Sequence, residues 1–228
     1  MNVALRGRKL GPQLLIDRQI VSSTAARLPQ LAAEGDWRGL HRALQLLVWL
    51  LQKEPGSSAK LASGRNTAAL LDIVSRAASG KEGGASAVPV ACTERALALL
   101  VVCVRCSEAA ADRAVESPFV RQLLRLLVSE GDGLVTPAAR RHVAGVLQAL
   151  SSKLEYKDVL QGAGTLEALL VALTNPAMLC DLQLMQELVW TLIGLADEDA
   201  AYKDLYREQG VQPLLTAVAA YIVQHQLP

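Results

Sequence analysis

Aromatic residues are scarce in this chain of 228 residues: they make up 4% of it, and phenylalanine occurs once. Apolar residues nevertheless reach 51%, so a core must be built mainly from leucine, valine and alanine, which suit helices better than strands. The formal net charge is +1, so the chain as a whole is not strongly basic, as a nucleic-acid-binding protein often is. No apolar run approaches the roughly 18–20 residues of a membrane span, so we expect none.

Groups that carry catalysis or hold metals are also few and scattered. The three histidines, His41, His142 and His225, show no short spacing to carboxylates that would indicate a metal site or a catalytic triad. Gly83-Gly84 is not followed by the Gly-Lys-Ser/Thr of a phosphate-binding loop. We therefore expect a protein that is not an enzyme, with no catalytic residue, metal, cofactor or small-molecule substrate.

The cysteines are too few for a disulfide framework. They are Cys92, Cys103, Cys106 and Cys180, and the chain shows no secretory signal, so reduced thiols in an intracellular, cytoplasmic or cytoskeletal protein are expected. Cys103 and Cys106 form a CxxC, but no second ligand pair follows for zinc, and the motif falls toward the end of a predicted helix. We interpret both as core or groove cysteines.

A pair of adjacent leucines recurs four times at nearly even spacing. The pairs are Leu70–Leu71, Leu123–Leu124, Leu169–Leu170 and Leu214–Leu215, with intervals that are almost equal apart from a longer first one. Such a period is typical of repeat proteins, in which each unit buries its apolar face against its neighbours. The sequence therefore predicts an array of helical units.

Each leucine pair follows a longer apolar stripe at helical spacing. The stripes start at Arg42, Arg95, His142 and Glu187, and each is followed by its leucine pair at almost the same distance along the chain. Two features that keep one register predict equivalent units, each with a long helix and a later helix that carries the leucine pair.

A shorter segment lies between the stripe and the leucine pair. Residues 156–160 read YKDVL and residues 202–206 read YKDLY, and each segment is followed by a glycine, Gly164 or Gly210. Glycine suits a tight corner because it accepts positive φ. Each unit is therefore predicted as a long helix, a short helix, a corner and a medium helix.

The chain is predicted to hold one repeat domain, residues 36–228, after an N-terminal basic arm or helix at 1–35. The arm is basic and carries hydroxyl residues, so a mitochondrial transit peptide remains an alternative for residues 1–28. Residues 79–91 are rich in glycine, serine and alanine and predict a flexible insertion. Thr136-Pro137 predicts a helix start, and Asn175-Pro176 predicts a break between helices.

This pattern resembles the armadillo repeat, a three-helix unit of about 42 residues with a glycine before its second helix. The resemblance covers roughly residues 36–226 and is clearest in 143–173 and 187–215, whereas the first two units also admit a HEAT-like description. It implies an all-α fold, an armadillo-like α-solenoid in which three-helix repeats form a right-handed superhelix. Long helices would then line a concave groove.

Peptide-binding armadillo proteins carry asparagines on those long helices, which bond the backbone of an extended peptide. The matching positions in this chain hold Trp49, Val102, Ala149 and Gly194. A companion tryptophan position four residues earlier holds Gln45, Ala98, Gly145 and Trp190. Because the asparagines are missing, the resemblance does not support binding of nuclear localisation signals.

Side chains on the predicted groove are the candidate protein-binding residues. Trp49 and Trp190 fall in groove positions, and tryptophan is common among binding hot spots, although packing between long helices is an equal alternative. A position two turns earlier predicts a polar rim, made of His41, Glu94, Arg141 and Gln186.

A modest basic cluster is the other candidate surface. Arg121 and Arg125 share a helix face and precede Arg140-Arg141. The cluster could touch phosphate or an acidic protein, but an exposed helical face is the simpler interpretation because no aromatic residues are interleaved.

These features predict a non-catalytic protein–protein interaction scaffold. We expect a structural subunit of a larger protein or ribonucleoprotein assembly, whose partners are other proteins and which meets nucleic acid only indirectly. The alternative is a regulatory adaptor that binds peptide segments transiently, such as a transport adaptor or a chaperone cofactor.

Overall fold

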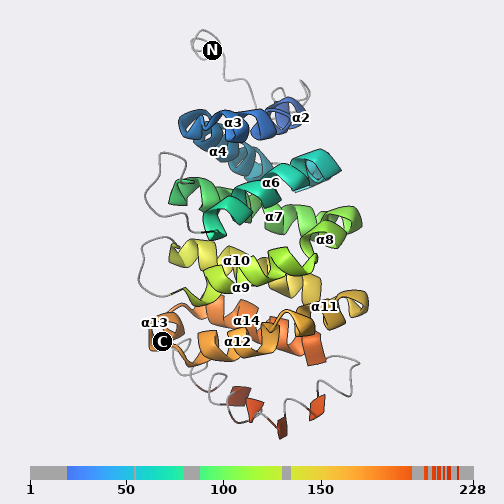
Figure 1. Cartoon of the computed structure of the whole chain (residues 1–228), viewed down its shortest axis with the longest axis vertical. Helices are drawn as coiled ribbons and strands as arrows, with labels where there is room; N and C mark the ends of the chain where they lie inside the picture. Colours follow the sequence, from blue (N-terminus) through green and yellow to red (C-terminus); the bar gives the residue numbers. More distant parts are fainter. Residues whose placement is uncertain are drawn as a thin grey trace.

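The computed structural model describes residues 20–53, 55–79, 88–129 and 135–196, with isolated positions between 203 and 220. These residues form helices and turns with no β-strand among them, which confirms the expected all-α class. Along the long axis of the molecule, the helices run from those of residues 20–34 near one end to those of residues 165–196 toward the other (Figure 1). Within these ranges, no helix is both long enough and apolar enough to cross a membrane.

The predicted apolar stripes form long helices that pack side by side. They are α4 (Trp37–Lys53), α7 (Val90–Cys106), α10 (Pro137–Ser151) and α14 (Leu182–Ala196). α4 packs against α7, α7 against α10, and α10 against α14 (Figure 1). One equivalent leucine in each helix is fully buried: Leu47, Leu100, Leu147 and Leu192.

The leucine pairs lie on a second set of packed helices. α6 (Gly64–Ala78) contacts α9 (Ser117–Val128), which contacts α12 (Thr165–Thr174). The first leucine of each described pair is fully buried: Leu70, Leu123 and Leu169. The second leucine is less uniform, since Leu71, Leu170 and Leu215 are only partly buried. Leu214 lies outside the described residues.

Short helices connect the two sets, as predicted. They are η1 (Pro55–Ser57) with α5 (Ser58–Leu61), α8 (Glu108–Ala114), and η2 (Leu154–Tyr156) with α11 (Lys157–Gly162). Gly164 has φ of 84° and Gly210 has φ of 66°, so both corner glycines adopt the conformation that motivated their assignment. A further short helix, α13 (Pro176–Leu179), precedes α14.

Thr136 and Asn175, which each precede a proline, cap the first turn of the helix that follows. The Thr136 hydroxyl oxygen accepts from the Ala139 N–H at 3.0 Å, where α10 begins. Asn175 Oδ1 accepts from the Ala177 N–H at 2.9 Å, where α13 begins. These bonds satisfy backbone donors that the first turn of a helix leaves free.

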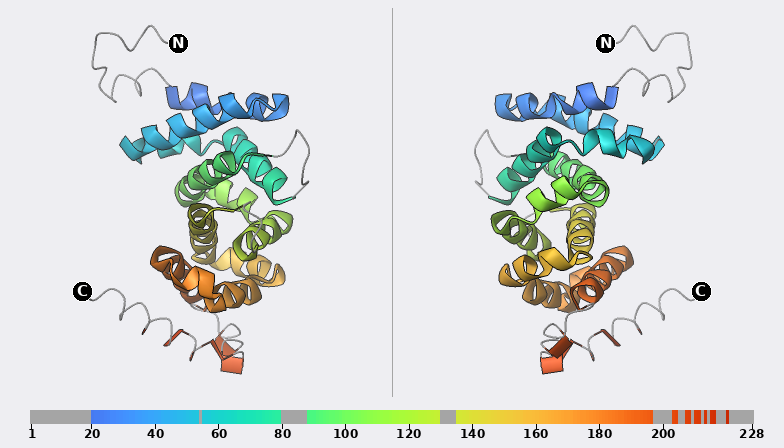
Figure 2. Two further views of the ribbon diagram at one scale, coloured as in Figure 1. Left: turned by 90° about the vertical axis from the view of Figure 1, so that its left-hand side faces the viewer. Right: turned by 90° about the vertical axis from the view of Figure 1, so that its right-hand side faces the viewer.

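Helices lie at two of the predicted segment boundaries. α2 (Ile20–Ala25) and α3 (Leu28–Glu34) pack against the helices that follow them, including α4 and α6 (Figure 2). Residues 20–34 therefore belong to the packed body, while residues 1–19 lie outside the described ones. The predicted insertion at 79–91 includes Val90 and Ala91, which belong to α7, and residues 80–87 also lie outside the description.

Long-range side-chain hydrogen bonds recur at about one unit length along the chain. They join residues 41 to 55 positions apart, from Arg121 with Gly162 at the short end to Cys92 with Trp37 at the long end. Tyr156 donates to Asp112 Oδ1 at 2.6 Å and Arg76 donates to the Ala32 carbonyl at 3.2 Å, both with a separation of 44. These bonds tie helices to others that lie about one predicted unit length away in the chain.

Candidate functional site

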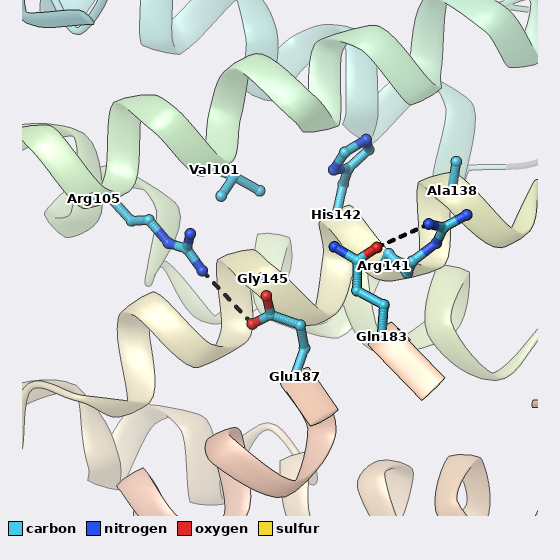
Figure 3. Close-up of a pocket in the computed structure, with 8 residues that line it drawn as sticks. All are labelled: Val101, Arg105, Ala138, Arg141, His142, Gly145, Gln183 and Glu187. Atoms are coloured by element: carbon cyan, nitrogen blue, oxygen red, sulfur yellow. Dashed lines mark hydrogen bonds and ion pairs between the residues drawn. The ribbon is translucent and has the colours of Figure 1, made fainter. Parts of the chain in front are cut away.

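A cavity of about 230 Å³ opens on the face shared by three consecutive long helices (Figure 3). α7 contributes Val101 and Arg105 to its wall. The remaining lining residues come from α10 and α14: Ala138, Arg141, His142, Gly145, Gln183 and Glu187. The cavity therefore depends on how these three helices pack, because no single helix supplies its walls.

Gly145 leaves the space at the centre of this face. A Cβ atom built there would lie 3.4 Å from Val101 Cγ2 and 3.9 Å from Arg105 Nη2. The position is buried in α10, so any longer side chain would fill the hollow between the two neighbouring helices. A glycine in a helix interior costs stability relative to alanine, and here its small size keeps the cavity open.

An ion pair joins the two helices on either side of α10. Arg105 Nη2 lies 3.6 Å from Glu187 Oε2, although the two residues belong to α7 and α14, which are two units apart in the chain (Figure 3). Adjacent packed helices lie about 8–10 Å apart, so two helices separated by a third are about twice that distance apart on a flat face. The two long side chains meet across α10 beside Gly145, which places no side chain between them.

A second cationic side chain is held on the other side of the cavity. Arg141 Nε lies 3.2 Å from Asp181 Oδ2, and Arg141 Nη1 donates to Gln183 Oε1 at 3.0 Å (Figure 3). The charged heads remain partly exposed, with 36% of the Arg141 side chain and 47% of the Arg105 side chain accessible. Both guanidinium groups can therefore meet a ligand that enters from solvent.

His142 forms part of the same wall and is neutral near pH 7. Burial lowers the pKa of its imidazole from 6.5; the nearby Glu94 carboxylate opposes this effect and the Arg141 guanidinium reinforces it. Glu94 is itself held in place, because the Thr136 hydroxyl donates to its Oε2 at 2.6 Å.

The structure places the two predicted tryptophans on different long helices that do not adjoin. Trp49 on α4 is 40% exposed and Trp190 on α14 is 53% exposed, with α7 and α10 between their helices. Trp190 occupies the position equivalent to Gly145, on the same face of α14 as Glu187. Its side chain thus continues the face that lines the cavity.

The position equivalent to Trp49 on α14 has a different environment from that of Trp49 on α4. It holds Gly194, where a Cβ atom would lie 2.7 Å from Ser151 Oγ of α10. That position therefore faces the preceding long helix in α14. Trp49 itself is too exposed to be a buried packing residue.

Among the predicted polar rim residues, only Arg141 lines the cavity. Glu94 is tied to Thr136, Gln186 is exposed on α14, and His41 is partly buried on α4. The predicted basic cluster is also divided. Arg140 donates to the Ser129 carbonyl at 2.6 Å, and Arg141 faces Asp181.

Sequence reasoning did not identify most of the cavity residues as functional. Arg105 lies within the CxxC motif, and no sequence pattern singled out Gln183. His142 and Glu187 occupied the equivalent position that begins each stripe, one residue after the predicted rim. This shared position could have pointed to the cavity residues, because it places one side chain of each predicted unit at an equivalent point on its long helix.

The CxxC cysteines occupy different environments. Cys103 is fully buried, and burial raises the pKa of its thiol to about 12. Cys106 is the last residue of α7, is exposed, and donates to Ser58 Oγ at 3.3 Å. Cys103 is therefore a core residue, as interpreted. In the described part of the chain, no group of histidines, cysteines and carboxylates gathers as a metal site.

Comparisons with protein-family models, with curated proteins and with solved structures found no match.

Proposed function

We propose that this protein is an armadillo-like α-solenoid, a right-handed superhelix of three-helix units, and that it acts as a non-catalytic interaction scaffold. It would be a structural subunit of a larger protein or ribonucleoprotein assembly inside the cell. The two sets of stacked helices support the fold, together with hydrogen bonds that recur at about one unit length.

One observation carries the functional part of this proposal. Trp190 and Ile193 lie one helical turn apart on one face of α14 and are 53% and 44% exposed. The same face carries Glu187 at the cavity, where Arg105 and Arg141 are also partly exposed. An exposed tryptophan and partly exposed arginines on one face match the composition typical of binding hot spots.

The cavity favours an adaptor as the second candidate. Pockets that bury a whole small molecule commonly measure about 300–1,000 Å³, whereas this cavity of about 230 Å³ suits one side chain of a peptide. A protein that recognises short segments transiently would need such a feature, and a permanent structural subunit would not.

Purification of the tagged full chain from the native cell under gentle conditions tests the scaffold proposal. We expect a complex larger than the monomer with defined partners at stoichiometric amounts. The W190A variant should lose the partners and keep its helical content. Leu154, 61% exposed on η2, provides a matched control, because L154A also removes an exposed apolar side chain but lies outside the cavity face.

Two results would count against this function. A wild-type chain that is recovered only as a free monomer would contradict the scaffold. A complex that persists in W190A, while binding of short peptides is lost, would favour the adaptor.

A further inference from the structure

We propose that the cavity between α7, α10 and α14 binds a carboxylate side chain from an acidic segment of a partner protein. This inference rests on the proposed function, because it specifies the chemistry of the segment that the scaffold recognises. The hydrogen-bonding groups of the cavity wall, the charges around them and the volume available support it.

Arg105 has donors to spare. A guanidinium group carries five N–H donors, yet both the Gln148 contact at 3.1 Å and the Glu187 ion pair use Nη2 alone. Across the described residues, Arg105 Nε and Nη1 contact no acceptor. The 3.6 Å separation from Glu187 also exceeds the roughly 2.7–2.9 Å of a charge-assisted hydrogen bond, so a closer carboxylate would compete well.

Further donors converge from α10 and α14. Because arginine has no acceptor, the bond from Arg141 fixes the Gln183 oxygen toward the guanidinium and leaves the Gln183 amide nitrogen facing away from it (Figure 3). Within the described ranges, that nitrogen and the His142 ring have no hydrogen-bond partner. The neutral imidazole supplies one N–H as well.

The balance of donors and acceptors favours an anion. Glu187 is the one acidic residue among those lining the cavity, and Asp181 beside it already pairs with Arg141, so Arg105 and the amide of Gln183 supply the open donors. A ligand carboxylate accepts several hydrogen bonds and would satisfy donors that the protein leaves open. A neutral apolar group would leave those donors unpaired when it displaced water.

The same wall disfavours a phosphate group. Glu187 lies in the cavity, and Glu94 lies near His142, so a phosphate with its second charge meets more repulsion than a carboxylate does. The volume of about 230 Å³ holds one side chain with the peptide backbone outside. Beyond Glu187, exposed Trp190 and Ile193 on α14 offer contact to an apolar residue beside the acidic one.

Selection from a displayed random dodecamer library on the full chain tests the proposal. We expect the enriched peptides to share an aspartate or glutamate next to an apolar residue. Fluorescence anisotropy of the synthesised peptide should then show a loss of about tenfold or more when its acidic residue becomes glutamine, as for a hydrogen bond to a charged group.

Two protein variants should change affinity in opposite directions. R105Q removes a donor that contacts the peptide and should weaken binding about tenfold. E187Q removes the competing carboxylate and should strengthen binding. R76Q is the matched control, because Arg76 forms an ion pair with Asp72 on α6, is 43% exposed and lies outside the cavity. A merely structural ion pair would make R105Q and E187Q shift affinity in the same direction.

Several outcomes would overturn the inference. They are a selection without enriched peptides, enriched peptides without a common acidic residue, equal binding to R105Q and wild type, and tighter binding when phosphoserine replaces the acidic residue. If the native complex of the scaffold test is intact while the selection fails, the proposed function stands and only this inference is rejected.

Discussion

Arg105 and Glu187 meet at 3.6 Å across the intervening helix α10, although they belong to long helices two units apart in the chain. The other cavity contacts join neighbouring units, as Arg141 with Gln183 does at a separation of 42. This ion pair therefore spans the intervening helix α10. Gly145 permits the close approach, because it places no side chain between the two charges.

A double-mutant cycle on R105Q and E187Q should give a small coupling energy. The side chains are 47% and 26% exposed, so solvent screens their attraction and the coupling should stay within about 1 kcal/mol. Urea unfolding measures it, and about 1 M salt should remove most of it. A coupling of several kcal/mol would show that the pair holds the array together, contrary to this expectation.

Replacement of two helical glycines by alanine should have opposite effects. Gly145→Ala places its Cβ at ordinary contact distance and gains helix propensity, so we expect stabilisation by about 0.5–1 kcal/mol. Gly194→Ala brings its Cβ to 2.7 Å from Ser151 Oγ and 3.1 Å from the Ser151 carbonyl oxygen, so we expect net destabilisation. Thermal unfolding compares the two. A lower melting temperature for Gly145→Ala would contradict the open space assigned to it.

The order of helices could be predicted from the sequence because it depends on local pattern. Leucines at helical spacing defined α7 and α10, and Thr136 before Pro137 marked a helix start that the structure confirms. Gly164 and Gly210 were recognised because positive φ is a property of the residue itself.

The cavity could not be predicted in the same way, because its parts come from three units. Arg105 on α7 contacts Gln148 on α10 and Glu187 on α14, and only the packing of these three helices brings the side chains together. The register aligned Trp190 with Gly145 and Trp49 with Gly194. Which of these positions faces a neighbouring helix depends on the direction of packing, and sequence periodicity alone does not specify it.

The two leucines of a pair should differ in their effect on stability. Leu169 on α12 is fully buried, so Leu169→Ala should lower the free energy of unfolding by about 2–5 kcal/mol. Leu170 is only partly buried, so Leu170→Ala should lower the free energy of unfolding clearly less. Urea unfolding of both variants tests this. Equal losses would show that the second leucine is as important to the core as the first.

Protonation of His142 should destabilise the folded protein. Burial lowers its pKa in the folded state below the value of about 6.5 in the unfolded chain, so the unfolded state binds more protons as pH falls. The contribution of this histidine to stability is complete above about pH 6.5 and is lost as pH falls through the folded-state pKa.

The unfolding free energy, measured in urea between about pH 7.5 and 5, should therefore decrease toward acid more steeply in the wild type than in H142Q. Glu94 and Arg141, which act on the ring, and the cavity residues Arg105 and Glu187 are present in both proteins, so the difference between the two slopes isolates the imidazole. Identical slopes would assign the pH dependence to other groups and reject a titrating histidine in the cavity wall.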